Sequence, residues 1–440
     1  ALQPALPPPP GTPPPPPPPF YQMAAGYAWT GQDLFGDSED YLGYELALSA
    51  DGTVVAVGAR SADPPNGNGG TIRNAGRVVV WEWSAQTGAW VSRAVVNGEL
   101  EYDRTGDAIA LSADGAILAI GEHQHDINNR GRVRVFDWDA SSEGYVVRGD
   151  PTNQLSGDAD HDYAGWSIDL SLDGTVLAMG ITGYDSGRGR VRVFVWDAAG
   201  GVWTQRGEDG DLDGITTGNE HGSSVALNDD GTVIAIGADK YAPSGITNAG
   251  LVRVWAWLGG AWHRRGQDIL GENLYTQVGG AVDLSADGTV LAVGDRGISI
   301  YDSPPGPHDE RGRVTVYEYN AGLNNWDDRG DPILGELNGD RGGYSLQLSA
   351  DGTGIVAGAK HNDPPDGSGG TLSNAGHARV WAYDAGSDAW HKVGEDLDGH
   401  VAGGWHGYAV GISADATVVA VSTHEYPSTQ GSMRVYTLQS

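Results

Sequence analysis

The chain has 440 residues and carries 58 acidic against 26 basic side chains, for a formal net charge of −32. A field of this sign repels nucleic acid phosphates and anionic lipid headgroups, so the charge argues against nucleic acid partners and membrane insertion. The 69 glycines suit short strands joined by tight turns, and the absence of cysteine excludes disulfides and thiolate metal sites.

The first 23 residues are rich in proline and are predicted to form a polyproline II arm outside the folded domain, which spans residues 24–440. Consecutive prolines lack the backbone donors that helices and sheets require. The run resembles the hydroxyproline-rich, extensin-like cell-wall glycoproteins of plants and algae, and this resemblance implies hydroxylation and O-glycosylation. The arm residues assigned to interaction or glycosylation are Pro7, Pro8, Pro9, Pro10, Thr12, Pro13, Pro14, Pro15, Pro16, Pro17, Pro18 and Pro19.

From residue 24 onward the phrase Leu-Ser-Ala-Asp-Gly-Thr recurs seven times with small variations. Consecutive copies lie 57 to 64 residues apart, a spacing typical of propeller or solenoid units. Each unit predicts four strands, with a tight Asp-Gly turn between the first and the second. The seven turn aspartates are Asp51, Asp114, Asp173, Asp230, Asp287, Asp351 and Asp415.

An aromatic residue recurs on the third strand of the units, and another follows it across the hairpin. A platform for stacking sugars is one interpretation of such pairs, but cross-strand packing is favoured. The pairs are Trp83 with Trp90, Trp138 with Tyr145, Trp196 with Trp203, Trp257 with Trp262, Tyr319 with Trp326, and Tyr383 with Trp390.

The two ends of the repeat region complement each other. The last unit stops after its third strand, at residues 433–440, while residues 27–34 match the fourth-strand segment at 261–270. We therefore expect the N-terminal strand to complete the last blade, so that no unpaired edge remains at the seam. The predicted fold is an all-β, seven-bladed β-propeller of four-stranded blades.

The order Gly-[Tyr/Trp]-Ser-Ile-x-Leu, a turn, Val-Leu-Ala-x-Gly-Ala and Gly-Arg-Val-x-Val-aromatic resembles the FG-GAP repeat of integrin α-subunits. Matching segments begin at Gly43, Gly165, Gly343 and Gly407. The resemblance implies a propeller whose second-to-third and fourth-to-first connections share one rim, opposite the Asp-Gly turns. The family often has a calcium loop, Asp-x-Asp-x-Asp-Gly, at those turns, but Ser-Ala-Asp-Gly offers too few oxygens for Ca²⁺. Asp51 and its equivalents are therefore predicted to be turn formers.

Two acidic stretches before first strands are candidate calcium sites, because carboxylates at alternate positions supply the oxygens that Ca²⁺ prefers. A solvated acidic loop is the alternative interpretation of both stretches. The candidate ligands are Asp37, Glu39 and Asp40 in the first stretch and Asp158, Asp160 and Asp162 in the second.

Two long loops of the predicted rim nearly duplicate each other. Each begins with Asp-Pro-Pro and continues through a glycine-rich stretch to Asn-Ala-Gly, ending at Asn74 or Asn374. Recent duplication and a shared contact are both consistent with this similarity. The rim residues singled out are Asp63, Pro64, Pro65, Asp363, Pro364 and Pro365.

The sequence gives no support for catalysis. No nucleophile elbow, P-loop or dinucleotide fingerprint stands in a suitable strand–helix context. The acidic residues noted on the innermost strands are Asp107, Asp169 and Asp283, which come from different blades. We therefore expect a protein that is not an enzyme.

The leading functional hypothesis is an extracellular structural glycoprotein whose propeller beads join head to tail through the proline-rich arm. Its partners are then other copies of the chain or components of the extracellular matrix or cell wall. The alternative is a ligand-binding or adhesion propeller that recognises protein or carbohydrate on its variable rim, with the arm as a stalk. The start at Ala-Leu-Gln-Pro fits a secreted protein whose signal peptide has been removed.

Overall fold

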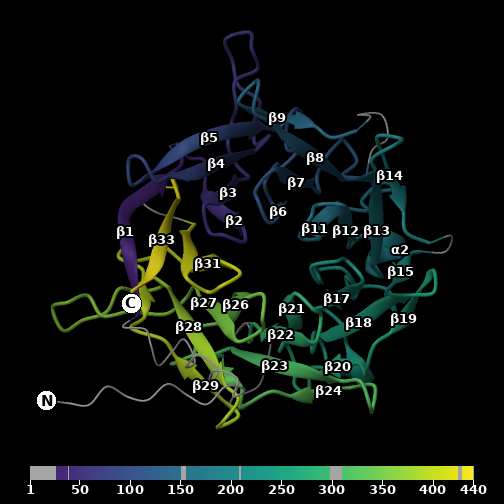
Figure 1. Ribbon diagram of the computed structural model, residues 1–440, viewed down its shortest axis with the longest axis vertical. Helices are drawn as coiled ribbons and strands as arrows, with labels where there is room; N and C mark the ends of the chain where they lie inside the picture. The colour runs from purple at the N-terminus through teal and green to yellow at the C-terminus, as the bar shows by residue number, and fades with distance from the viewer. Residues whose placement is uncertain are drawn as a thin grey trace, which may run out of the picture.

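The computed structural model describes residues 26–37, 39–149, 155–207, 210–297, 310–424 and 429–439. Within these residues seven antiparallel sheets are arranged as blades around a central axis (Figure 1). This arrangement confirms the predicted seven-bladed propeller. The proline-rich arm and the boundary between residues 23 and 24 lie outside the described residues.

Each of the first three blades runs from an innermost strand outward. Blade 1 consists of β2 (Leu42–Leu48), β3 (Val54–Ala59), β4 (Arg77–Ser84) and β5 (Ala89–Asn97). Blade 2 consists of β6 (Ala108–Leu111), β7 (Ile117–Glu122), β8 (Arg132–Asp139), β9 (Gly144–Val147) and β10 (Leu155–Ser156). Blade 3 consists of β11 (Ala164–Leu170), β12 (Val176–Ile181), β13 (Arg190–Asp197), β14 (Val202–Gln205) and β15 (Leu212–Asp213).

The remaining four blades repeat this order. Blade 4 consists of β16 (Ser224–Leu227), β17 (Val233–Gly237), β18 (Leu251–Leu258), β19 (Ala261–Arg264) and β20 (Ile269–Leu270). Blade 5 consists of β21 (Val278–Leu284), β22 (Val290–Asp295), β23 (Arg313–Asn320), β24 (Asn325–Asp328) and β25 (Ile333–Leu334). Blade 6 consists of β26 (Gly342–Leu348), β27 (Gly354–Ala359), β28 (His377–Asp384), β29 (Ala389–Lys392) and β30 (Leu397–Asp398). Blade 7 consists of β31 (His406–Ile412), β32 (Val418–Thr423), β33 (Ser432–Gln439) and β1 (Gly26–Phe35).

The outer strand of blades 2 to 6 is interrupted, so that two short pieces pair with the same third strand. In blade 4 the break includes Gly266, which has a left-handed φ of 82°. The helical segments of the described residues are α2 (Tyr184–Gly187) and η1 (Pro243–Gly245). Neither is long or apolar enough to cross a membrane.

The hydrophobic core is divided among the interfaces between neighbouring blades. Each of seven buried clusters in the described residues joins two adjacent blades, and one of them joins Leu34, Met433 and Val435 of blade 7 to Leu42 and Val57 of blade 1. Both faces of a blade are therefore apolar, which explains why second strands such as β3 are buried throughout. The predicted aromatic pairs are confirmed, with ring centroids 5.2–5.8 Å apart.

The N-terminal strand closes the ring as predicted. β1 pairs with β33, beginning with Gly26 opposite Gln439. Gln32 then joins blade 7 to blade 1, because its side chain donates to Trp90 O at 3.0 Å and accepts from Trp90 N at 2.9 Å. Gln267 makes the same two bonds to Trp326 between blades 4 and 5, at 2.8 Å each. The seam therefore repeats an ordinary blade interface.

The Asp-Gly turns form a second closed ring. Asp51 Oδ1 accepts hydrogen bonds from Ser49 Oγ at 2.8 Å and Thr53 N at 2.9 Å, which confirms its role as a turn former. One backbone N–H of each turn also donates to the turn of a neighbouring blade. The bonds run from Ala50 to Ala113 (2.9 Å), Ala113 to Leu172 (2.8 Å), Leu172 to Asp229 (2.8 Å), Asp229 to Ala286 (3.1 Å), Ala286 to Ala350 (2.8 Å), Ala350 to Ala414 (3.0 Å) and Ala414 to Ala50 (2.8 Å).

Candidate functional site

The second-to-third loops and the fourth-to-first loops share one rim, as predicted. The end of each second-to-third loop forms a parallel bridge to the end of the fourth-to-first loop of the next blade, for example Gly76 to Thr105 and Gly376 to His406. This rim surrounds the mouth of the channel opposite the ring of turn hydrogen bonds. Side chains that vary between repeats therefore meet at one end of the molecule.

Two repeat positions lie at this mouth, beside a cavity of about 480 Å³. The first follows a left-handed glycine at the start of each innermost strand, and all seven blades contribute it to the cavity lining. The second lies just beyond the end of each second strand, and Arg60, His123, Asp239 and Arg296 of this set also line the cavity. The first set is Tyr44, Asp107, Trp166, Ser223, Gly280, Tyr344 and Tyr408, and the second is Arg60, His123, Thr182, Asp239, Arg296, Lys360 and His424.

A third position, which we call the left-handed ring, lies in the fourth-to-first loop three residues before each of the first set. In all seven blades this residue is not glycine, has a φ between 53° and 58°, and is half-buried. Its N–H donates to a carbonyl of the preceding blade, as in Tyr41 to Thr429 at 2.9 Å and Gln277 to Asn248 at 3.0 Å. The ring consists of Tyr41, Arg104, Tyr163, Glu220, Gln277, Arg341 and Trp405.

Other left-handed positions of the same rim follow the usual steric preference only in part. The carbonyl partners on the second-to-third loops include four asparagines, whereas the position two residues before the ring is glycine in three blades and Glu39, Tyr102, His161 or Tyr275 in the other four. Asparagine and glycine adopt this conformation at little cost, whereas a bulky side chain costs about 1 kcal/mol or more. The asparagines are Asn74, Asn129, Asn248 and Asn374, and the glycines are Gly218, Gly339 and Gly403.

Aromatic rings and cations concentrate where blades 6, 7 and 1 meet the mouth. Lys360 Nζ lies 3.6 Å from the ring centroid of Tyr344 and 4.7 Å from that of Tyr408. The guanidinium of Arg60 lies 3.8 Å from the ring centroid of Tyr44, which in turn is 5.3 Å from Tyr408. Cations held over aromatic faces in this way are favourable and fixed in place.

Charges at the mouth perturb one another. Burial raises the pKa of Tyr344, but the nearby cations Arg296 and Lys360 lower it by more. The pKa of Tyr344 is therefore below the ordinary value for a tyrosine. Burial and the neighbouring Tyr344 raise the pKa of Tyr408. Burial also raises the pKa of Glu45 to about 7. Glu45 is an acidic residue of an innermost strand that the sequence analysis missed.

Of the acidic residues noted on innermost strands, only Asp107 lies at the mouth. Its carboxylate is buried and lies 2.8 Å from His123 Nδ1 and 3.7 Å from Arg60 Nη1. Asp169 and Asp283 lie deeper in the channel, where each accepts a backbone hydrogen bond from the next blade, from Leu227 N and Leu348 N. The sequence does not separate these two roles.

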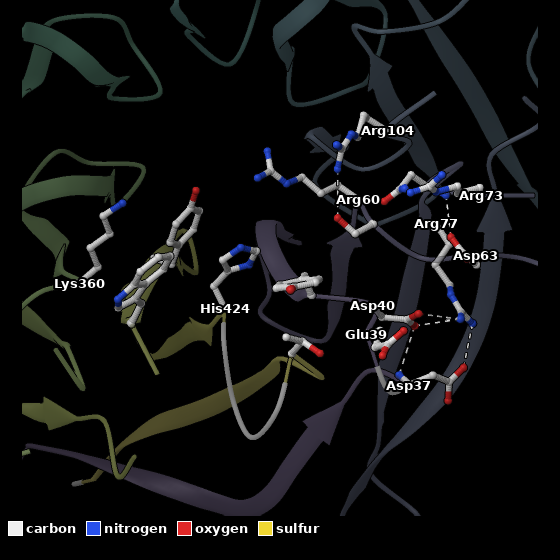
Figure 2. A pocket seen from close by; sticks show the side chains of 16 residues that line it. Asp37, Glu39, Asp40, Arg60, Asp63, Arg73, Arg77, Arg104, Lys360 and His424 are labelled. Atoms are coloured by element: carbon white, nitrogen blue, oxygen red, sulfur yellow. Dashed lines mark hydrogen bonds and ion pairs between the residues drawn. The ribbon is translucent and has the colours of Figure 1, made fainter. Parts of the chain in front are cut away.

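The first candidate calcium stretch lines a cavity of about 830 Å³ that adjoins the mouth at Arg60 and Tyr408 (Figure 2). Asp37 and Asp40 lie 3.0 Å and 2.8 Å from the Arg77 guanidinium, while Glu39 is exposed on the cavity wall. Asp40 also accepts from Asp37 N at 3.2 Å, which closes the loop. The structure therefore brings these residues together around Arg77.

The second calcium stretch is similar. Asp162 accepts hydrogen bonds from Asp158 N at 2.8 Å and Ala159 N at 2.9 Å. Asp158 binds Arg192, whose guanidinium holds the pKa of that carboxyl below its usual value, and exposed Asp160 lies 3.9 Å from Arg130 Nε. These carboxylates serve loop closure and ion pairs, so calcium at either stretch stays a prediction.

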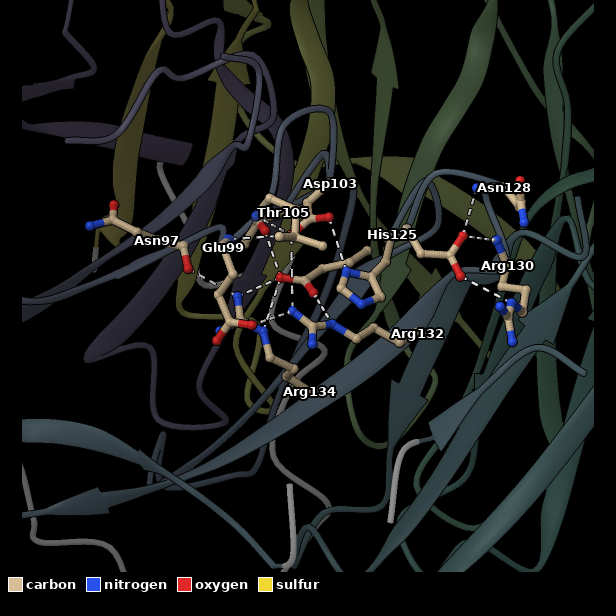
Figure 3. A network of polar contacts seen from close by, with 12 residues as sticks. Asn97, Glu99, Asp103, Thr105, His125, Asn128, Arg130, Arg132 and Arg134 are labelled. Carbon is tan, nitrogen blue, oxygen red and sulfur yellow. Dashed lines mark hydrogen bonds and ion pairs between the residues drawn. The ribbon is translucent and has the colours of Figure 1, made fainter. Parts of the chain in front are cut away.

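A different acidic cluster is buried between blades 1 and 2 (Figure 3). Asp103, Glu122 and His125 bring three potential metal ligands together. However, Glu122 already accepts from Arg132 Nε at 2.5 Å and Thr105 Oγ1 at 2.6 Å, and Arg134 forms an ion pair with it. Because guanidinium groups neutralise Glu122, this donor set suits a structural network rather than a metal ion.

The duplicated rim loops adopt the same structure. Asp63 Oδ1 accepts from Asn74 N at 2.6 Å, and Asp363 Oδ1 accepts from Asn374 N at 2.7 Å. Pro65 and Pro365 form bridges to threonines six residues later, and the carbonyls of Pro64 and Pro364 accept hydrogen bonds at 2.8 Å and 2.9 Å. These contacts explain the shared sequence by shared loop closure.

The fold and the mouth define the protein as a seven-bladed β-propeller with a variable, aromatic and charged rim. No protein-family model matches the chain, and no curated protein matches it. The functional reading therefore rests on the residues of the mouth.

Proposed function

We propose that the propeller is a ligand-binding module and that its binding site is the channel mouth on the loop rim. The left-handed ring is the observation that carries this proposal. Its backbone conformation is the same in every blade, but its side chains are bulky and differ between blades. Strained residues of this kind cluster at ligand-binding sites.

A purely structural bead offers no reason to keep this strain. Asparagine or glycine at the ring positions would preserve the hydrogen bonds to the preceding blade and relieve the conformational cost. Retention of tyrosine, arginine, glutamate, glutamine and tryptophan is consistent with side chains selected for what they contact. Recognition of protein or carbohydrate on the rim of an extracellular, FG-GAP-like propeller is therefore the favoured function.

Head-to-tail assembly through the proline-rich arm stays a prediction, since the arm lies outside the described residues. Regular fibres of the full chain that disappear when residues 1–23 are removed would support it. Single particles of both chains under the electron microscope would rule it out.

Two variants of blade 3 test binding at the mouth, because their substituted residues lie at opposite ends of the channel. Trp166 lies at the mouth and is 40% exposed, whereas Leu172 lies in the Asp-Gly turn at the other end and is 43% exposed. Labelled protein is applied to arrays of oligosaccharides and extracellular peptides. We expect a ligand that binds the wild type and Leu172→Ala equally and binds Trp166→Ala at least about tenfold more weakly. Absence of any ligand, or equal binding by both variants, contradicts the proposal.

A further inference from the structure

Five cations of the rim lack the carboxylate partners that cations have elsewhere in the molecule, whereas Arg60 and Lys240 at the mouth pair with Asp107 and Glu220. Most described lysines and arginines lie within 4.0 Å of an acidic group, as expected in a chain with 58 acidic and 26 basic residues. Of the rest, Arg206 and Arg265 lie over the third-strand rings of Trp257 and Tyr319, and Arg311 has a partner. The described cations that remain without an ion pair are Arg73, Arg104, Arg296, Arg341 and Lys360, all on the rim.

These cations form an arc around one side of the mouth. Arg296 and Lys360 flank Tyr344, with the guanidinium of Arg296 4.7 Å from its ring centroid. Arg341 is close enough to lower the pKa of Lys360, although burial lowers it more. Arg104 donates to Ser61 Oγ at 3.1 Å, beside Arg60. Like charges held together in this way repel each other, and an anionic ligand relieves that repulsion.

An exposed indole belongs to the same cavity. Trp166 lines the cavity of about 480 Å³ together with Arg296 and Tyr344, and its ring is 4.8 Å from that of His123. Trp29 and Trp166 are the described tryptophans that are at least 40% exposed, and Trp166 is the one of these two that lies on an innermost strand. A flat apolar face near cations suits a ring-shaped ligand that carries a negative charge at its edge.

We propose that the mouth binds an acidic carbohydrate, with a uronate ring stacked on Trp166 and carboxylates of the oligosaccharide received by Arg296 in the same cavity and by Lys360 in the adjoining one. This inference rests on the proposed function and specifies its ligand class. A cavity of about 480 Å³ is the size of a small-ligand site and admits one end of an oligosaccharide rather than a folded surface. Bidentate guanidinium–carboxylate pairing supplies selectivity over neutral sugars.

Calorimetric titration with oligomers of galacturonate, guluronate and glucuronate tests this assignment. Their carboxyl-reduced counterparts and a glutamate hexapeptide serve as comparison probes. We expect an acidic oligosaccharide to bind, its neutral counterpart to bind at least about tenfold more weakly, and Arg296→Gln and Lys360→Gln to weaken binding by a similar factor. Arg265→Gln is the matched control, because this arginine also lacks an ion pair but directly follows the outer strand β19. If Arg296→Gln does not fold, Arg104→Gln replaces it.

Each outcome discriminates. If neutral oligosaccharides bind equally well, or the peptide binds more tightly, the assignment of an acidic carbohydrate as the ligand is wrong. The proposed function still holds in that case if Trp166→Ala reduces the observed binding. An acidic oligosaccharide that binds Arg296→Gln and Lys360→Gln as tightly as the wild type also overturns the inference. If no probe binds, the carbohydrate assignment fails, and the peptide and sugar arrays decide whether the mouth binds anything.

Discussion

At the residue scale, the left-handed ring shows that the backbone conformation and the identity of the side chain have separate explanations. The N–H of each ring residue must reach a carbonyl of the preceding blade, and a positive φ provides the necessary direction. That requirement accounts for the conformation, but glycine meets it at lower cost. The identity of the side chains therefore reflects a second requirement, which we assign to the ligand.

Replacing a ring residue by glycine is expected to cost little stability. In Gln277→Gly, relief of the left-handed conformation offsets the greater flexibility of the unfolded chain, each effect being about 1 kcal/mol. Glu272→Gly in the same loop lacks the relief, because Glu272 has no positive φ. Urea unfolding should therefore show Gln277→Gly to be more stable than Glu272→Gly by about 1 kcal/mol. Equal losses in the two variants would show that the ring carries no strain.

The sequence revealed those residues whose partners lie within one repeat. Asp51 and the pair Trp83–Trp90 contact neighbours a few positions away, so their local pattern was sufficient. The mouth combines residues from seven repeats, and the Gly-[Tyr/Trp]-Ser motif that contains Trp166 does not show that these residues meet. Aligning the repeats column by column gives part of the missing signal, since Glu45 then stands out among serines and alanines.

At the element scale, the innermost strands connect neighbouring blades through polar side chains. Ser167, Ser224 and Ser345 donate to glycine carbonyls of the next blade at 2.7–3.0 Å. Two residues later in the repeat, Asp169 and Gln347 accept from backbone N–H groups of the next blade at 2.6 Å and 2.7 Å. A neutral glutamine performs the same function as an aspartate, so the negative charge is dispensable for this contact.

The stability contributed by Asp169 should therefore depend on pH. Burial raises its pKa to about 7 despite hydrogen bonds from Leu227 and Leu170, so the folded state binds a proton more tightly than the unfolded chain. This contribution is complete below the unfolded pKa of about 4 and is lost as the pH rises through about 7. Asp169→Asn removes the dependence.

The melting temperature of Asp169→Asn relative to the wild type should accordingly rise between pH 4 and pH 8 in scanning calorimetry. Asp160→Asn is the matched control for the loss of a carboxylate, because Asp160 is exposed in a loop. A difference for Asp169→Asn that is flat across this range would place the carboxylate in contact with solvent.

At the scale of the whole molecule, the ring depends on one strand from the other end of the chain. Asp33 of β1 binds Arg434 of β33 through two hydrogen bonds of 2.6 Å and 3.1 Å, just as Asp268 binds Arg253 within blade 4. The sequence predicted this closure because the N-terminal segment repeats a fourth strand that the last unit lacks. It did not predict the ring of turn hydrogen bonds, since backbone contacts between blades leave no residue pattern.

Truncation distinguishes the arm from the closing strand. A chain that begins at residue 24 should melt at the temperature of the full chain, because no described residue of the propeller is lost. A chain that begins at residue 36 lacks β1, exposes the edge of β33 and should melt lower and self-associate. Asp33→Ala, which removes one ion pair and keeps the strand, controls for the loss of charge. Light scattering and calorimetry measure both effects, and equal melting of the two truncated chains would contradict the predicted closure.

The pairing of β1 with β33 also determines how the ring responds to a pulling force. The strands are antiparallel, with Gly26 opposite Gln439 at one end and Phe35 opposite Ser432 at the other. Force applied between the segment before Gly26 and the end of β33 meets the paired residues one at a time and unzips them. Force directed along β1 against the far side of the ring loads all the paired residues together in shear. The seam is therefore mechanically weak in one direction and strong in the other.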